Sequence, residues 1–452
     1  MISLLMQRMT DYGNAKALIT NQLHYTYVDL LRLTLEAKSR IDKEGLNNQS
    51  VVVIVGDFSM TSIAIMLACL LSKTTIIPVT ENAYKKLKDQ LDALKPDFLI
   101  NTFPPEPIIS KYKHEVDETY QWRDLLPKSE AGLIVFTSGT TGTPKAILHS
   151  VDRLCYRYLT KKPPLNCICF LKFDHMGGFN TLLGILFRGG TAIIPSRLDP
   201  DIICREIELN KVDILPATPS FLTQLLVSKA IQRYNLDSLK IISYGTEVMS
   251  ENILIRLNRE LPQCKLKQTY GLSETGVFNI KSKSNTSLWF KFIDPGVEYK
   301  VVDDLLWIKT KSNLLGKLVF ENQKVTIEPN TKEWFCTEDI VETDNDYFKI
   351  KSRVTDIINV GGLKVYPVEV ENCILQLPYV TDVTVLAEKN ALIGEMVVAH
   401  IVLPSGVSFN AVKKEIKQHC FEHMERYKVP SKFVVSERNF VNDRFKKARF
   451  NA

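Results

Sequence analysis

The sequence predicts an α/β protein with a large N-terminal α/β domain, containing parallel-type sheets and a small β region, and a small mobile α+β C-terminal domain. Three observations support this prediction. Buried apolar runs such as Val51–Val55 and Thr75–Val79 flank a helical stretch, 59–71, in a βαβ pattern. Later strands end in glycine-containing polar loops, and short alternating runs begin near residue 285. At 452 residues the chain is also too long for one core.

The elements of the large domain follow from hydrophobic periodicity. After an amphipathic helix at 25–41 and the βαβ unit come a helix at 82–94, a strand at 97–100 and a polar connection at 101–130. The next expected elements are strand 167–172, helix 180–187, strand 191–195, a helix starting at Pro219 after the capping residue Thr218, strand 239–243, a helix with Ile253, Leu257 and Leu261 on one face, and strand 265–269. This succession predicts an open sheet whose ligands bind at the C-terminal ends of its strands.

The remaining sequence predicts the β region and the second domain. Short alternating runs at 299–302, 305–309, 317–321 and 346–350 indicate the β region. A hairpin at 357–365, a helix from Pro367, strands at 382–387 and 395–403, and a helix at 408–424 form a unit of domain size. We therefore predict domains at 1–353 and 354–452.

Composition excludes several classes of function. The net charge is +6, from 57 basic and 51 acidic residues that are scattered along the chain, which is too mild to predict nucleic-acid binding. The most apolar helical stretch, 62–71, is too short to cross a bilayer, and the N-terminus is too briefly apolar for a secretory signal. Nine cysteines, an odd number, argue against a disulfide framework. These features predict a cytoplasmic protein without membrane insertion.

A glycine- and hydroxyl-rich loop between two apolar runs is the strongest functional signal. It comprises Thr137, Ser138, Gly139, Thr140, Thr141, Gly142, Thr143, Pro144 and Lys145. Backbone N–H groups, hydroxyls and one cation in such a loop can surround a phosphate chain. The alternative is a flexible surface loop, but a linker would not be bracketed by buried strands. The kinase-type spacing G-x-x-x-x-G-K-[ST] is absent, so we expect a different nucleotide chemistry.

This loop and six further motifs resemble those of the adenylate-forming superfamily, which contains acyl-CoA synthetases, peptide-synthetase adenylation domains and luciferases. The chain looks most similar to acyl-CoA ligase-like members. The motifs cover nearly the whole chain in the family's order, and the set is specific although each motif alone is weak. The six are the segment 173–178 around His175, Tyr244 to Glu247, Tyr270 to Glu274, Asp339, the hinge 351–356 with the following 358–367, and the lysines Lys446 and Lys447.

The resemblance implies a two-step reaction. ATP and a carboxylic acid form an acyl-adenylate and pyrophosphate, and a thiol then displaces AMP. Glu274, with Thr137, would ligate Mg²⁺, a cation that prefers oxygen ligands. Lys446 would bridge the carboxylate and the α-phosphate, with Lys447 as the neighbouring candidate. The expected ATP- and AMP-binding residues beyond the loop are Gly245, Thr246, Glu247, Tyr270, which would stack on adenine, Gly271, Ser273, and the ribose-binding Asp339 and Arg353.

His175 stands where the family places an aromatic gate between the acyl and nucleotide pockets, so it joins Lys446 and Glu274 as a catalytic candidate. The acyl site would be lined by His175, Gly177, Gly178, Phe179 and Asn180. No acidic residue occurs at 177–181, where amino-acid-activating relatives place the partner of the substrate amine. We therefore expect the substrate not to be an α-amino acid.

For the second step, Gly361, Gly362 and Lys364 resemble the hairpin that lines a pantetheine tunnel in CoA ligases after the small domain rotates. The acceptor is expected to be CoA, and the phosphopantetheine arm of a carrier protein is the alternative. A homodimer is left open. Glu338, Thr355 and Phe445 depart from the family pattern, at positions usually held by Gly, by Asp or Lys, and by Gly. These departures are the only support for a third reading, a non-catalytic nucleotide- or acyl-binding relative.

Overall fold

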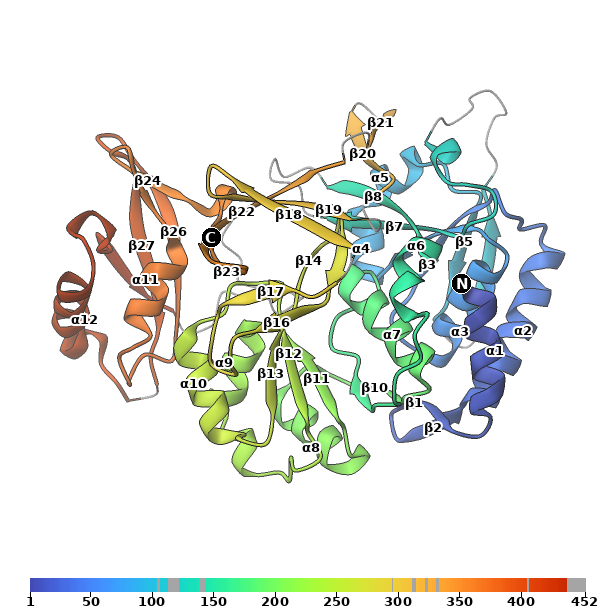
Figure 1. Ribbon diagram of the computed structural model, residues 1–452, viewed down its shortest axis with the longest axis horizontal. Helices are drawn as coiled ribbons and strands as arrows, with labels where there is room; N and C mark the ends of the chain where they lie inside the picture. The colour runs from blue at the N-terminus through green and yellow to red at the C-terminus, as the bar shows by residue number, and fades with distance from the viewer. Residues whose placement is uncertain are drawn as a thin grey trace.

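The computed structural model of the chain describes residues 1–103, 106–112, 122–137, 144–294, 296–310, 314–321, 324–330, 333–404 and 406–436. Two large sheets, a smaller β region and a C-terminal unit follow one another along the molecule (Figure 1). The C-terminal unit lies at one end of the long axis, and the helices α1 (Ile2–Tyr12), α2 (Tyr27–Lys43) and α3 (Met60–Leu71) lie at the other. In the part of the chain that is described, no helix is both long and apolar enough to cross a membrane.

The first large sheet has eight strands in the order β21-β20-β8-β7-β4-β3-β5-β6. Its strands are β3 (Val51–Val55), β4 (Thr75–Val79), β5 (Phe98–Asn101), β6 (Ile108–Lys111), β7 (Gly132–Thr137), β8 (Lys145–Ser150), β20 (Gly316–Glu321) and β21 (Lys324–Pro329). Strands β3, β4, β5 and β7 are parallel, which confirms the predicted βαβ unit. Helix α3 has a buried residue at nearly every position, as expected of the crossover helix of such a unit.

Three expectations for this region were wrong in detail. The helix expected at 82–94 is interrupted at Leu87, giving α4 (Glu81–Lys86) and α5 (Lys88–Ala93). Part of the expected connection 101–130 forms β6, which pairs antiparallel with β5, and the 3₁₀ helix η1 (Arg123–Leu125). The strand expected at 317–321 is β20, and it pairs with β8 in the large sheet and not with the β region.

The second large sheet has seven strands in the order β13-β12-β11-β9-β10-β1-β2. They are β1 (Lys16–Thr20), β2 (Leu23–Thr26), β9 (Cys167–Ile168), β10 (Ala192–Ile194), β11 (Ile214–Ala217), β12 (Ile241–Tyr244) and β13 (Lys265–Gln268). All neighbours are parallel except β1 and β2. The accompanying helices are α6 (Val151–Cys155), η2 (Tyr156–Tyr158), α7 (Met176–Arg188), α8 (Pro200–Asn210), α9 (Pro219–Val227), η3 (Ala230–Gln232) and α10 (Glu251–Glu260).

Local signals account for most of these boundaries. The Thr218 hydroxyl accepts a hydrogen bond from the Phe221 N–H, so Thr218 caps α9 with Pro219 at its first position, as predicted. The strand expected at 167–172 ends at Ile168, and the helix expected at 180–187 starts four residues earlier, at Met176. His175 is its cap residue, a role that the sequence did not indicate.

The β region consists of a six-stranded antiparallel sheet and a two-stranded hairpin. The sheet contains β16 (Ile280–Ser282), β17 (Phe290–Phe292), β18 (Val297–Val302), β19 (Leu305–Thr310), β22 (Phe335–Asp344) and β23 (Tyr347–Arg353), and the hairpin is β14 (Tyr270–Leu272) with β15 (Gly276–Phe278). Tyr270, Phe278, Phe290 and Phe348 are buried together in its core. This confirms the predicted β region, with Tyr270 as a member of its core.

The C-terminal unit contains β24 (Ile358–Val360), β25 (Leu363–Val365), α11 (Pro367–Ile374), β26 (Asp382–Asn390), β27 (Gly394–Val402), α12 (Phe409–His423), η5 (Arg426–Lys428) and β28 (Lys432–Val435). Its hydrophobic core, which includes Val365, Ile374, Val385, Ile401 and Ile416, is separate from the other cores. The 3₁₀ helix η4 (Val354–Asp356) leads into it. The small α+β domain is thus confirmed as a fold, while the boundary between residues 353 and 354 stays a prediction.

Candidate active site

A cavity of about 590 Å³ lies where the two large sheets and the β region meet. Its wall is formed by the end of β7, the start of β8, the first turns of α7, the segment after β12, the hairpin β14–β15 and the strands β22 and β23. The cavity therefore lies at the C-terminal ends of parallel strands, where α/β proteins bind ligands. Its volume is in the range of small-molecule sites, about 300–1,000 Å³.

The cavity collects many of the side chains and glycines that the motifs singled out. Those that line it are Thr137, Lys145, His175, Gly177, Asn180, Gly245, Thr246, Tyr270, Gly271, Ser273, Glu274 and Arg353. Gly178, Phe179, Glu247 and Asp339 do not line it, and neither do Gly361, Gly362 and Lys364. Residues 138–143 and the C-terminal residues 437–452 lie outside the described residues, so the predictions for Ser138, Gly139, Thr140, Thr141, Gly142, Thr143, Phe445, Lys446 and Lys447 stay predictions.

The two ends of the expected phosphate loop are fixed opposite each other. Thr137 ends β7 and Lys145 begins β8, and the two residues are partners in an antiparallel ladder. Both residues line the cavity. The loop connecting them therefore joins two neighbouring strands, whereas the kinase-type phosphate loop joins a strand to a helix.

The His175 side chain caps α7. Its Nδ1 accepts a hydrogen bond from the Gly177 N–H at 2.9 Å, so a neutral ring carries its proton on Nε2. A Cβ on Gly178 would lie 2.0 Å from the Lys172 carbonyl oxygen. Glycine at 178 is therefore required for the close approach of α7 to the preceding loop. Phe179 is buried, and it lines a neighbouring cavity of about 540 Å³.

The turn after β12 brings its backbone close to the neighbouring strand. A Cβ on Gly245 would lie 2.2 Å from Thr269 Oγ1, and Thr246 has a φ of 71°. Glycine and a left-handed residue therefore bring this turn against the end of β13. Glu247 points elsewhere, because its carboxylate accepts hydrogen bonds from the Ser220 hydroxyl at 2.8 Å and the Ser220 N–H at 3.1 Å.

A buried carboxylate joins two sides of the cavity. Asp339 Oδ2 accepts a 2.6 Å hydrogen bond from the Tyr270 hydroxyl, and Oδ1 accepts a 3.0 Å bond from Arg353 Nε. Asp339 and Arg353 are direct partners across β22 and β23. Burial raises the pKa of Asp339, and the Arg353 charge opposes this shift. The pair thus holds Arg353 at the cavity wall, beside the ring of Tyr270.

Glu338 occupies a strained backbone position next to this pair. Its φ is 61°, in the left-handed region that costs a non-glycine residue about 1–2 kcal/mol. The family's usual glycine would remove that cost. In this chain the glutamate lines the cavity and adds a second carboxylate near Arg353.

His149 supports the site and was missed by the sequence analysis. Its Nε2 donates to the Ser273 carbonyl oxygen at 2.6 Å, which fixes the segment that carries Glu274. Burial lowers the pKa of His149 to about 4, so the ring is neutral at pH 7. The available signal was a histidine within the buried strand at 145–150, because a buried polar group needs a partner.

The residues present fit a phosphate-held magnesium ion. Glu274 and Thr137 line the same cavity and supply one carboxylate and one hydroxyl. No group of three or more His, Cys, Asp or Glu side chains in the described ranges is arranged to hold a metal by itself. Mg²⁺ is commonly bound by one or two carboxylates together with substrate phosphates, so this donor set suits a metal–nucleotide complex.

Comparisons with known proteins agree on one family. The family described as AMP-binding enzyme matches residues 5–326, and the AMP-binding enzyme C-terminal domain matches residues 369–441. Acyl-CoA synthetase 7 of Caenorhabditis elegans is 28% identical over 405 residues, covering 81% of this chain and 72% of that protein. 4-Coumarate-CoA ligase 1 of Narcissus pseudonarcissus is 28% identical over 326 residues, covering 65% of this chain. The alignment spans 59% of the Narcissus enzyme.

Solved structures share the fold. The anthranilate CoA ligase AuaEII with anthranoyl-AMP has a TM-score of 0.78 and 17% identity, covering 97% of this chain and 93% of that one. ATP-bound MatB from Rhodopseudomonas palustris has a TM-score of 0.77 and 19% identity, covering 98% and 96%. These likenesses confirm the predicted fold class.

Proposed function

Because this chain belongs to the AMP-binding enzyme family, we propose that it uses ATP to activate a carboxylic acid as an acyl-adenylate and then transfers the acyl group to a thiol, with CoA as the acceptor. One observation carries the proposal. A single cavity brings together the ends of the phosphate loop, the Tyr270–Glu274 segment, Arg353 and the acyl-side residues around His175. A carboxylate and a nucleotide bound there would be next to each other.

In the first step a carboxylate oxygen of the acid bonds to the α-phosphorus of ATP. The bond from that phosphorus to the bridging oxygen breaks, and pyrophosphate leaves with the electron pair. The barrier comes from bringing an anion to an anionic phosphate, so cations and N–H donors at the site lower it. Lys145 lies at the wall where the phosphate loop ends. Mg²⁺, held through Glu274 and Thr137, would supply further charge neutralisation.

Arg353 and Asp339 would hold the nucleoside. The Arg353 guanidinium is fixed by one bond to Asp339, which leaves other N–H donors for ribose hydroxyls. Tyr270 is fixed at the cavity wall by its hydroxyl bond to Asp339 and by the stacking of its ring with Phe278 and Phe290, and we propose that adenine binds beside it.

In the second step the thiol sulfur attacks the acyl carbon and AMP leaves. Gly361 and Gly362 form the turn between β24 and β25, with φ values of 57° and 86°. Neither glycine lines the cavity. We therefore propose that the small domain moves between the two steps. In one arrangement Lys446 would serve the first step, and in the other the Gly361–Gly362 turn would serve the second.

Acid-dependent ATP–pyrophosphate exchange tests the first step, using aliphatic, aryl and amino acids. Exchange with at least one carboxylic acid is the expected result. ATP binding without exchange for any acid would overturn the enzyme proposal in favour of a binding protein. Mass detection of the thioester, after addition of CoA or a phosphopantetheinylated carrier protein, then identifies the acceptor.

A further inference from the structure

The acyl side of the site opens into a second, cationic cavity of about 210 Å³. Four basic side chains line both this cavity and the larger one: Arg157, Lys162, Arg188 and Lys267. They come from η2, the segment after it, the last residue of α7, and β13. Among the described residues, no Asp or Glu side chain lines the smaller cavity. We call these four side chains the cationic cluster.

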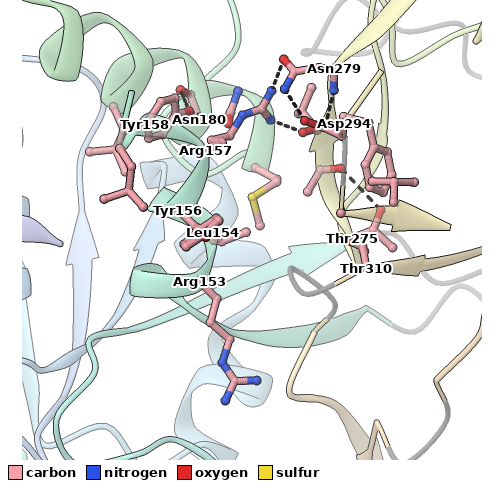
Figure 2. A pocket seen from close by; sticks show the side chains of 18 of the residues that line it. Arg153, Leu154, Tyr156, Arg157, Tyr158, Asn180, Thr275, Asn279, Asp294 and Thr310 are labelled. Carbon is pink, nitrogen blue, oxygen red and sulfur yellow. Dashed lines mark hydrogen bonds between the residues drawn. The ribbon is translucent and has the colours of Figure 1, made fainter. Parts of the chain in front are cut away.

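Two members of the cluster are fixed by neutral partners. Arg157 donates to the Val277 carbonyl and, at 3.0 Å, to Asn279 Oδ1. Figure 2 shows its guanidinium near Asn279, with Asn180 and Tyr158 on its other side. Arg188 Nε donates to the Pro163 carbonyl oxygen at 3.0 Å. Because these acceptors are neutral, the positive charges are oriented but not neutralised.

Two acidic side chains near the cluster, Asp294 and Asp213, have partners outside it. Asp294 accepts hydrogen bonds from the Asn279 backbone and side-chain amides, at 2.7 and 2.5 Å. Asp213 pairs with Lys240 at 2.6 Å. Within the described part of the chain, none of the salt bridges includes a member of the cationic cluster.

The cluster therefore carries electrostatic repulsion in the unliganded protein. Lys267 is half-buried, and its pKa is lowered by burial first and then by Arg157, Lys162, Lys265 and Arg188. Cations that converge in a low-dielectric cavity are unfavourable unless an anion joins them. A bound anion would offset this repulsion. Cations kept together only for stability would be expected to have acidic partners within the protein.

The cluster lies deeper along the strands than the nucleotide side of the cavity. Lys267 is the register partner of Ser243 on β12, and the turn at Gly245 lies against Thr269, which follows the end of β13. Two strand residues span about 7 Å at roughly 3.3 Å each. His175 and the cluster line the same larger cavity, so one ligand could have its reacting carboxylate near His175 and extend to the cluster.

We propose that the cationic cluster binds a second anionic group on the acyl substrate, so that the acid is a dicarboxylate or a phosphorylated carboxylate. This inference rests on the proposed function. It also agrees with the absence of an acidic side chain at 177–181, because an ammonium group has no partner there. The carboxylate nearer His175 reacts, and the far anion is held by Arg157, Arg188 and Lys267.

The test measures binding by calorimetry in the presence of a non-hydrolysable ATP analogue. The ligands are α,ω-dicarboxylates of increasing length, the monocarboxylate of each length, and an ω-phosphono acid of the preferred length. The proteins are the wild type, Lys267→Met, Lys267→Arg and the control Lys265→Met. Lys265 is exposed on the same strand, and it does not line the cavity.

We expect the wild type to bind the best dianionic acid at least about tenfold more tightly than the matched monocarboxylate, the value of one charge-assisted contact. Lys267→Met should lose this preference, and Lys267→Arg and Lys265→Met should keep it. Comparing the Kd of the ω-phosphono acid with that of the dicarboxylate of the same length shows whether the cluster prefers a phosphorus oxyanion or a carboxylate. Equal binding of mono- and dianionic acids by the wild type would overturn the proposal, as would equal losses in the Lys267→Met and Lys265→Met proteins.

Two further readouts separate the outcomes. Lys267→Met should have a higher melting temperature than the wild type, because the substitution removes repulsion between cations. If Lys267→Met does not fold, the binding test is repeated with Lys162→Met, because Lys162 is exposed. A Lys267→Met effect on the KM of CoA alone would assign the cluster to the acceptor and overturn the proposal. Selective dianion binding without pyrophosphate exchange would refute the proposed function only. Exchange with monocarboxylates alone would refute the substrate inference only.

Discussion

Acid should weaken this protein through His149. The folded protein holds the ring neutral, with Nε2 donating to Ser273 and burial lowering its pKa to about 4. An unfolded histidine has a pKa of about 6.5. Between pH 4 and 6.5 the unfolded state therefore binds more protons than the folded state. Stability from this group is complete above pH 6.5, falls as the pH falls through that window, and is constant below it.

The magnitude follows from the two pKa values. The difference between a pKa of about 6.5 in the unfolded state and about 4 in the folded state corresponds to about 3 kcal/mol of stability, which is lost once the pH is below both values. At pH 5 the loss is about 2 kcal/mol, because only the unfolded state is then largely protonated. His149→Gln removes the titration while keeping a neutral N–H donor. Between pH 7 and pH 5 the wild type should therefore lose about 2 kcal/mol more than the variant.

Urea unfolding at several pH values, followed by tryptophan fluorescence, measures this difference. His24→Gln is the matched control for the loss of one histidine, because His24 is exposed on β2. A proton NMR titration of His149, assigned with the glutamine variant, gives the pKa directly. The reasoning fails if His149 titrates near 6.5, or if wild type and His149→Gln lose stability in parallel.

Three predictions concern the proposed chemistry. Asp339→Asn should raise the Kd of ATP about tenfold or more in calorimetry, because Arg353 loses its charged partner; an unchanged Kd would contradict the ribose assignment. Glu274→Gln should raise the Mg²⁺ concentration needed for pyrophosphate exchange about tenfold, and an unchanged requirement would remove Glu274 from the metal site. Lys446→Ala should abolish exchange while ATP binding survives, and Lys447→Ala should retain exchange; the reverse pattern would transfer the role to Lys447.

Much of the fold was predictable because its signals are local. Continuous apolar runs gave the parallel strands β3 and β4, and the Thr218-Pro219 cap gave the start of α9. The break at Leu87 was missed because periodicity continues through one residue that leaves helical geometry. Helix α1 was also not predicted, although Ile2, Leu5 and Met9 mark its buried face. Pairing of β20 with β8 depends on contacts distant in sequence, which no local pattern contains.

The nucleotide side of the site was easier to predict than the acyl side. The family resemblance was confirmed, and its motifs are contiguous, so Tyr270, Glu274 and Arg353 could be named from sequence. The cationic cluster comes from four separate segments, and each member resembles an ordinary surface residue in sequence. His149 gained its role only through a bond to Ser273, which lies in the turn between β14 and β15 and is distant in sequence. The roles of His149 and the cationic cluster depend on tertiary packing, so no sequence spacing could have predicted them.

The position of Arg353 determines how the two proposed steps can alternate. Its side chain is bound to Asp339 in the large domain, and η4 begins with the very next residue, Val354, which is 45% exposed. Thr355 follows within the same 3₁₀ turn. Backbone rotation that starts at Val354 leaves the Asp339–Arg353 pair and Tyr270 in place. In the proposed mechanism the small domain would therefore bring the Gly361–Gly362 turn to the cavity while the adenylate stays bound, which is what transfer to a thiol without loss of the intermediate requires.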